Sequence, residues 1–202
     1  MNVKTTFLAL IVFALSACMP APDYDPMQFE VEGTRIIATG DIDSTTQANF
    51  QKIFSDNPGI QTLELSFVGG SVDDDANLRF AQFVRASGLK THVPADGLIA
   101  SGGTDLFLAG VARSIAPGAC VGVHAWSGGQ GSALDLPKDD AQHALYLRYY
   151  DSIGIARDFY WFTLAAAPAE GMHWMTVEEF ARFQVVTDGS ANPSSAEVCD
   201  QR

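Results

Sequence analysis

The chain has 202 residues, of which 47% are hydrophobic and 18% charged, and this length suits one ordinary domain with a sizeable core. It carries 12 Lys and Arg residues against 24 Asp and Glu residues, a formal net charge of -12, which argues against a nucleic-acid-binding protein because phosphate neutralisation needs clustered positive charge. Dense apolar runs argue against a disordered chain.

The N-terminus has the pattern of a secretory signal. Lys4 precedes an apolar run over residues 7–15, which is shorter than the roughly 20 residues that span a bilayer. The Leu-Ser-Ala-Cys tetrad at residues 15–18 resembles the lipobox of bacterial lipoproteins. That resemblance implies a signal peptide over 1–17, lipidation of Cys18 and, with Met19 next, a place in the cell envelope on the periplasmic face of the outer membrane. Ordinary cleavage after residue 17 is the alternative.

Three prolines follow the tetrad within a short, acidic stretch. Pro20, Pro22 and Pro26 prevent a helix, so residues 18–33 are expected to form the lipid anchor and an extended tether. The folded domain is expected over 34–188 and a C-terminal tail over 189–202.

Residues 34–167 alternate between strand and helix patterns. We expect strands over 35–39, 61–67, 89–93, 113–116 and 120–126. We expect helices over 46–57, 72–87, 104–109 and, with a break at Gly154, 138–167. Asp73, Asp74 and Asp75 fall in the first turn of the second helix, where acids favour the helix dipole, so we interpret them as structural. This alternation predicts parallel strands with helices on the sheet faces.

Two segments carry residues suited to catalysis. Ser101 lies in a glycine-rich segment ahead of an apolar helix, and His124 ends a strand 23 residues later. A serine at a helix N-terminus has backbone N–H groups close by, and its hydroxyl becomes a nucleophile where an imidazole takes its proton. Taken singly, the serine also fits a helix N-cap and the histidine a half-buried structural residue.

The order of these parts resembles the ClpP protease family within the ClpP/crotonase superfamily. The resemblance covers roughly residues 34–188 and implies an α/β fold of stacked βαβ spirals. It implies Ser101 as nucleophile, His124 as general base, and the N–H groups of Gly70 and Gly102 as the oxyanion hole. It further implies a peptide or protein substrate, no cofactor, no metal, and a possible homo-oligomer in which aromatic residues of 138–167 meet another subunit.

One position departs from the family pattern. Where the family has the aspartate that orients the histidine, this chain has Met172. Glu170 is the nearest carboxylate and becomes the candidate third catalytic residue. Without such a carboxylate, Ser101 and His124 form a catalytic dyad. In well-studied triads, loss of the orienting carboxylate lowers the rate about ten-thousandfold.

Three other functions compete with the serine–histidine hydrolase. The segment around Ser101 also resembles signal-peptide-peptidase-type enzymes, whose base is a lysine, and Lys138 is the sole lysine downstream of it. Crotonase chemistry would polarise a thioester with the same two N–H groups. An inactive ClpP-like protein would serve as an interaction module in the envelope.

The remaining cysteines form an even pair if Cys18 is lipidated. In an oxidising compartment, Cys120 and Cys199 are then expected to form a disulfide that ties the C-terminal tail to the strand ending at His124. Two separate thiols are the alternative, because sequence gives no distance between them.

Overall fold

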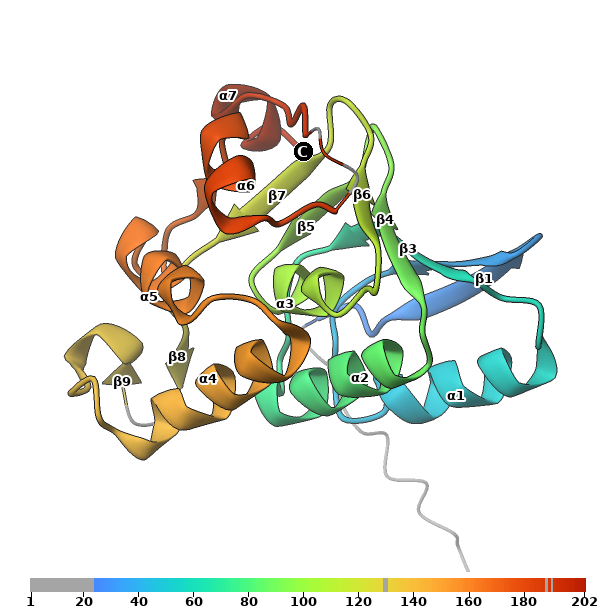
Figure 1. Ribbon diagram of the computed structural model, residues 1–202, viewed down its shortest axis with the longest axis horizontal. Helices are drawn as coiled ribbons and strands as arrows, with labels where there is room; N and C mark the ends of the chain where they lie inside the picture. Colours follow the sequence, from blue (N-terminus) through green and yellow to red (C-terminus); the bar gives the residue numbers. More distant parts are fainter. Residues whose placement is uncertain (1–23, 129–130, 188, 190) are drawn as a thin grey trace, which may run out of the picture.

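The computed structural model describes residues 24–128, 131–187, 189 and 191–202 (Figure 1). The expected signal peptide and Cys18 lie outside the described residues. Within the part that is described, no helix is both long and apolar enough to cross a membrane.

A mostly parallel sheet forms the framework of the domain. Its strands are β1 (Gln28–Glu32), β2 (Arg35–Thr39), β3 (Thr62–Val68), β4 (Lys90–Val93), β5 (Leu98–Ala100), β6 (Arg113–Ile115), β7 (Cys120–Val123) and β10 (His173–Trp174). β1 and β10 pair antiparallel at the two edges, and the pairs between them are parallel. A separate short hairpin joins β8 (Ser127–Gly128) to β9 (Gly131–Ser132).

Helices connect and cover these strands. They are α1 (Thr46–Asp56), α2 (Asp74–Ala86), α3 (Gly102–Leu108), α4 (Ala141–Ile153), α5 (Arg157–Ala166), α6 (Val177–Phe183) and α7 (Ala196–Cys199), with a 3-10 turn at Ala133–Asp135. Figure 1 shows α1 and α2 side by side below the sheet, with α3 between α2 and the strands.

Strand β3 divides the sheet into two branches. Its first half, Thr62 to Glu64, pairs with β4, and its last two residues, Phe67 and Val68, pair with β5. β4 continues to β6, while β5 continues to β7. Successive βαβ units therefore turn away from a single plane, as a spiral of such units requires, and the branch through β5 and β7 carries Ser101 and His124 at its ends.

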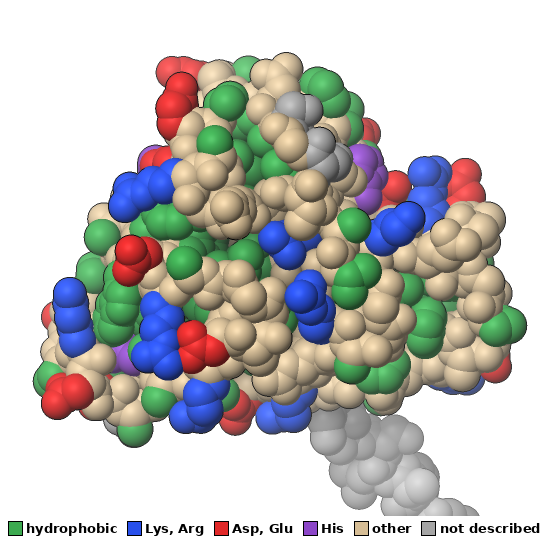
Figure 2. All heavy atoms as spheres, viewed as in Figure 1, with side chains coloured by type: hydrophobic (Ala, Val, Ile, Leu, Met, Phe, Trp, Pro, Cys, Tyr) green, Lys and Arg blue, Asp and Glu red, His purple; other side chains and the backbone are tan. Residues whose placement is uncertain are grey.

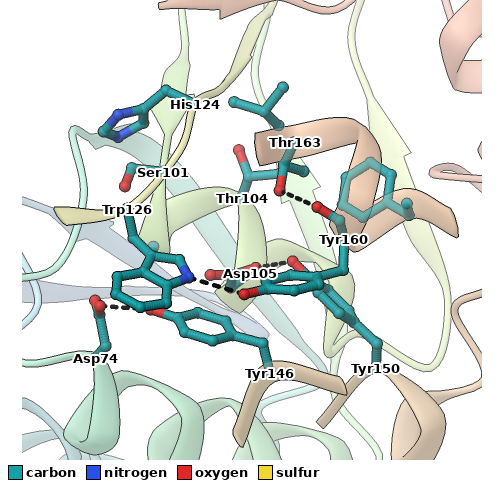
Figure 3. Close-up of a pocket in the computed structure, with 13 residues that line it drawn as sticks. Asp74, Ser101, Thr104, Asp105, His124, Trp126, Tyr146, Tyr150, Tyr160 and Thr163 are labelled. Carbon is teal, nitrogen blue, oxygen red and sulfur yellow. Dashed lines mark hydrogen bonds between the residues drawn. The ribbon is translucent and has the colours of Figure 1, made fainter. Parts of the chain in front are cut away.

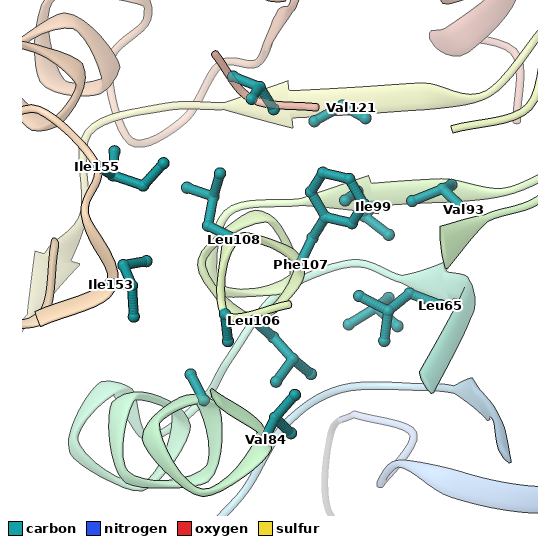
Figure 4. Close-up of a cluster of buried hydrophobic side chains, with 14 of the residues drawn as sticks. Leu65, Val84, Val93, Ile99, Leu106, Phe107, Leu108, Val121, Ile153 and Ile155 are labelled. Carbon is teal, nitrogen blue, oxygen red and sulfur yellow. The ribbon is translucent and has the colours of Figure 1, made fainter. Parts of the chain in front are cut away.

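The buried core lies around α3. Leu106, Phe107 and Leu108 are fully buried and pack among apolar side chains of β3, β5, β7 and α2 (Figure 4). Full burial of each such side chain contributes about 1.5–3 kcal/mol. This packing holds the helix that follows Ser101.

Two boundaries differ from the sequence-based expectation. β1 lies inside the segment expected as a tether, 18–33, because Phe29 packs on Phe50 and Phe80 and so draws this strand onto the helices. β5 was not expected as a strand. It has only three residues between glycine-rich turns, and its strand conformation comes from pairing with β3 and β7 on both sides.

The aromatic residues of α4 and α5 pack within their own chain. Five of them are buried: Tyr146, Tyr149, Tyr150, Phe159 and Tyr160. The two helices fold back on each other around Gly154, whose φ of 77° ends α4. These side chains therefore offer no free surface for a second subunit, and the homo-oligomer remains a prediction.

Charged side chains are interspersed on the surface. On the face shown in Figure 2, Lys and Arg side chains lie among Asp and Glu side chains and form no single basic patch.

The C-terminal segment is tied to the strand that leads to His124. A disulfide joins Cys120 of β7 to Cys199 of α7, the pair expected from the sequence, at a sequence separation of 79. The Arg202 guanidinium donates to the carbonyl oxygens of Gly97 and Gly118, at 3.3 and 3.0 Å. The tail thus supports both β5 and β7 from outside the sheet.

We expect removal of this disulfide to destabilise the domain. In the chain-entropy model, a cross-link closing a loop of this length stabilises by about 4 kcal/mol. The double variant Cys120→Ala, Cys199→Ala should lower the free energy of unfolding by up to that amount in urea titrations. Reductant should produce a similar loss in the wild type and none in the variant. Two free thiols in the oxidised wild-type protein would contradict the bridge.

Candidate active site

Ser101 occupies a sharp junction between β5 and α3. Its backbone has φ 52° and ψ −125°, a conformation that non-glycine residues rarely adopt and that costs about 1–3 kcal/mol. Its side chain makes no capping hydrogen bond, so the hydroxyl does not serve as an N-cap. The Ser101 N–H instead donates to the Gly122 carbonyl at 3.1 Å. A strained turn that presents an uncommitted hydroxyl is typical of nucleophilic serines.

His124 follows β7 and lies beside Ser101 in the same cavity (Figure 3). Its Nδ1 is 3.1 Å from the carbonyl oxygen of Ala169. Because a carbonyl only accepts, Nδ1 carries the proton in the neutral ring and Nε2 is left as the basic nitrogen. No hydrogen bond joins the two side chains among the described residues, and such contacts often form only when substrate is bound.

The two glycines expected as the oxyanion hole lie next to Ser101. A Cβ on Gly70 would lie 3.3 Å from the Ser101 Cβ and 3.7 Å from its Oγ. A Cβ on Gly102 would lie 2.4 Å from the Ser71 Oγ, so only glycine fits there. In the described chain, neither glycine N–H donates to a backbone carbonyl. Both donors are therefore free to bind a developing negative charge.

The expected third residue, Glu170, does not hold the histidine. Its side chain is exposed, and the ring nitrogen that an acid would bind is taken by the Ala169 carbonyl instead. Met172 approaches the sheet, where its sulfur would lie 2.6 Å from a Cβ on Gly122. The Met172 side chain therefore makes an apolar contact with β7.

Lys138 lies away from this site. It is exposed, its Nζ is 5.3 Å from the centre of the Trp161 ring, and it does not line the cavity beside Ser101. It also precedes its helix, since α4 begins at Ala141 with Asp140 as the N-cap. The structure therefore does not bring a lysine base to Ser101.

Two aspartates form the inner wall of the cavity, and the sequence analysis did not predict this role. Asp74 accepts from the Tyr146 hydroxyl at 2.5 Å, and Asp105 accepts from the Tyr150 hydroxyl. Asp73 is the N-cap of α2 and so lies just before the first turn, where the sequence placed it, and Asp74 turns inward to line the cavity. The one available signal was Asp105 itself, a lone acid in an otherwise apolar helix.

Burial raises the pKa of Asp105 to about 7, and the charge of Asp74 adds to the effect, while the hydrogen bond from Tyr150 opposes it. Burial and the same carboxylates raise the pKa of Tyr146 and Tyr150 well above the usual range. Both phenols therefore keep their protons at every physiological pH and act as donors to the carboxylates.

Comparison with known proteins identifies the fold. No family model and no curated protein matches the sequence. Similar solved structures include a mutant membrane-bound stomatin-specific protease in complex with a substrate peptide, at 18% identity over 72% of this chain and 71% of that chain, with a TM-score of 0.49. An enoyl-CoA hydratase from Polaromonas sp. JS666 is 13% identical over 87% and 74%, with a TM-score of 0.49.

A third solved structure, Pseudomonas aeruginosa AtuE, is 12% identical over 87% of this chain and 73% of that chain, with a TM-score of 0.50. At these identities, likeness shows the fold alone. The chain has the mixed α/β fold with a mostly parallel sheet that the sequence led us to expect, and it shares that fold with AtuE.

We expect Asp105→Asn to change how stability depends on pH. Between about pH 4 and 7 the Asp105 carboxyl keeps its proton in the folded state and loses it in the unfolded state, because its pKa is raised on folding. The free energy of unfolding of the wild type therefore falls as the pH rises through this range. As the pH rises from 4 to 8, the free energy of unfolding of the variant should increase by on the order of 3 kcal/mol relative to that of the wild type, measured by urea unfolding. Asp56→Asn, at an exposed site, is the control. A pH-independent difference would contradict the raised pKa.

Proposed function

We propose that this chain is a serine hydrolase that cleaves peptide bonds, with Ser101 as nucleophile and His124 as general base. The observation that carries the proposal is the strained Ser101 junction, whose free hydroxyl lies in one cavity with His124 and beside two N–H groups without backbone partners. A structural serine would have no need of a conformation that costs free energy.

The proposed reaction uses four groups of this chain. The Ser101 Oγ attacks the scissile carbonyl carbon while the His124 Nε2 accepts the hydroxyl proton. The carbonyl oxygen becomes negative and is bound by the N–H groups of Gly70 and Gly102. His124 then gives the proton to the leaving amine, and an acyl-serine remains. Water, activated by the same imidazole, releases the acid and restores Ser101.

The proposed dyad lacks a charged partner for the histidine. The Ala169 carbonyl sets the tautomer, which is one part of the role of a triad aspartate. A carbonyl dipole stabilises the imidazolium formed during attack less than a carboxylate does. We therefore infer a slower enzyme than those with full triads.

We expect a fluorophosphonate probe to label Ser101. Ser101→Ala should abolish the adduct, and His124→Ala should slow labelling by about 100-fold or more, the usual contribution of general base catalysis. Lys138→Ala and Glu170→Gln should label at the wild-type rate, because neither side chain lines the cavity. Intact-protein mass spectrometry with peptide mapping measures each rate.

Other outcomes would favour the competing functions. Loss of labelling in Lys138→Ala with retention in His124→Ala would indicate a serine–lysine enzyme. Binding of an acyl-CoA without any probe adduct would indicate crotonase chemistry. Equal labelling of Ser101→Ala protein, or no labelling and no acyl-CoA binding, would leave an interaction protein as the function.

We also propose that the protein acts in a bacterial envelope, anchored through Cys18 and acting on peptides or unfolded proteins at the periplasmic face of the outer membrane. The lipobox tetrad motivates this location, and a disulfide between Cys120 and Cys199 is compatible with an oxidising compartment.

We expect Cys18→Ser to move the protein from the membrane to the soluble fraction. Expression of the full chain in a bacterium with two membranes, followed by fractionation and mass spectrometry of the mature N-terminus, provides the measurement. Cys120→Ser should stay in the membrane fraction and serves as the matched control. Release of the wild type as a soluble protein with an unmodified Cys18 would end the anchoring proposal.

A further inference from the structure

The cavity beside Ser101 combines negative charge with aromatic walls. Asp74 enters it from α2 and Asp105 from α3, while Trp126, Tyr146 and Tyr160 line it from the other side (Figure 3). No lysine or arginine lines it in the part of the chain that the structure describes. Two carboxylates thus face one small cavity without a cationic partner.

Asp105 has an unused acceptor. The Tyr150 hydroxyl donates to its Oδ1, and no described residue donates to its Oδ2. Asp105 lines the cavity, and its carboxylate is largely desolvated there. Asp74 differs, because Ser71 and Tyr146 donate to its two oxygens. Asp105 is therefore the carboxylate that is free to bind a donor entering beside Ser101.

The aromatic wall suits the remainder of a long cationic side chain. The Trp126 and Tyr146 rings stack with centroids 5.8 Å apart and planes 10° apart, and Tyr146 stacks on Tyr160 at 5.4 Å. Such surfaces cover methylene groups, and indole and phenol rings attract cations within about 6 Å. The Tyr160 oxygen accepts from the Trp126 Nε1 at 3.0 Å and lies 2.6 Å from the His143 Nδ1, so these two bonds hold this wall of the cavity together.

We propose that this cavity is a specificity pocket that binds a lysine or arginine side chain of the peptide substrate, with Asp105 as the residue that selects positive charge. The inference rests on the proposed hydrolase function, since it identifies the residue whose carbonyl Ser101 attacks. A charge-assisted hydrogen bond to a buried carboxylate contributes more than one between neutral groups, so the pocket discriminates strongly against uncharged side chains.

The pocket must open to admit a side chain. The enclosed cavity volume is about 30 Å³, too small for a lysine or arginine side chain, and about 400 Å³ when the open space at its mouth is included. Trp126 is half-buried and leads directly into the exposed strand β8, and its ring is held over the cavity by the stack on Tyr146 and the hydrogen bond to Tyr160. Binding therefore requires Trp126 to move off Tyr146, which breaks a ring stack that spectroscopy can follow.

The selectivity depends on pH in a defined direction. Only ionised Asp105 binds a cation strongly, and its pKa of about 7 in the free protein means that affinity rises as the pH increases from 6 to 8. The other titratable groups that line the cavity or interact with Asp105, from α2, α4, α5 and the end of β7, are Asp74, Tyr146, Tyr149, Tyr150, Tyr160 and His124. Arg85 and Arg113 act on Tyr149, the neighbour of Tyr150.

Binding to Ser101→Ala protein tests the pocket without catalysis. We expect n-butylguanidinium to bind and n-butylurea, its neutral isostere, to bind at least about tenfold more weakly in calorimetric titrations at pH 8. Asp105→Asn should lower guanidinium affinity about tenfold and leave butylurea unchanged, while Asp56→Asn, outside the cavity, should change neither. The same titration at pH 6 should give weaker guanidinium binding, and Trp126→Phe should remove the fluorescence change.

Hydrolysis of matched peptides separates this inference from the proposed function. We expect kcat/KM to be higher for substrates with Arg or Lys before the scissile bond than for those with Leu or Glu, and Asp105→Asn to reduce the Arg-to-Leu ratio about tenfold. Ser101-dependent cleavage that favours Leu would overturn the pocket assignment and leave the hydrolase in place. Guanidinium binding without any Ser101-dependent cleavage would retain the cation site and reject the hydrolase. Equal binding of both isosteres to folded protein would reject the cation site.

Discussion

One carbonyl group, that of Gly122 in β7, joins the two halves of the candidate site. It accepts from the Ser101 N–H at 3.1 Å and from the Thr104 hydroxyl at 2.8 Å. The first bond fixes the strained serine and the second fixes the helix that follows it. Since His124 lies two residues beyond Gly122, any shift of β7 moves the base and the nucleophile together. The spacing of the dyad is thus a property of backbone pairing, which substitutions at the surface do not alter.

The same glycine explains why the histidine has no acid. Met172 and Trp174 pack against Gly122 so closely that a Cβ there would lie within 3 Å of both side chains. β10 pairs with β7 at this point, and the chain ahead of it brings the Ala169 carbonyl to the His124 ring. A backbone carbonyl at this position orients the histidine without placing a third carboxylate next to Asp74 and Asp105. In a protein with this excess of acidic residues, that arrangement limits repulsion around the cavity.

Sequence patterns were sufficient where local physics decides the outcome. The end of α4 at Gly154 and the strand leading to His124 follow from glycine conformation and apolar runs. Sequence patterns were insufficient where contacts between distant segments determine the local structure. β5 is a strand because β3 and β7 flank it, and β1 belongs to the sheet because Phe29 meets the helices. These contacts span many residues and leave no local pattern.

The inward-facing acids were missed for a related reason. An aspartate in the first turn of a helix is usually explained by the helix dipole, and that explanation holds for Asp73 and Asp75. Asp74 differs because α4, some 70 residues later, places the Tyr146 hydroxyl against it. Asp105 is likewise explained only by Tyr150 and by its partner acid. A buried carboxylate with an oxygen that accepts no hydrogen bond destabilises the fold unless a ligand binds it. Carboxylates with such strongly shifted pKa values are found chiefly at functional sites.

The two unfavourable features of the site lie on the same short helix. Ser101 is strained at the start of α3, and Asp105 is desolvated one turn later. The apolar face of the same helix is fully buried in the core through Leu106, Phe107 and Leu108. Burial of each of these side chains stabilises the fold by about 1.5–3 kcal/mol, which is comparable to the free-energy cost of the strained turn and of the buried acid. The apolar face of the helix therefore holds it in the core, while the polar groups on its other face have few hydrogen-bond partners. A ligand that supplies positive charge to that face and a carbonyl to Ser101 would stabilise both features at once, which is the physical reason to assign selectivity and chemistry to one cavity.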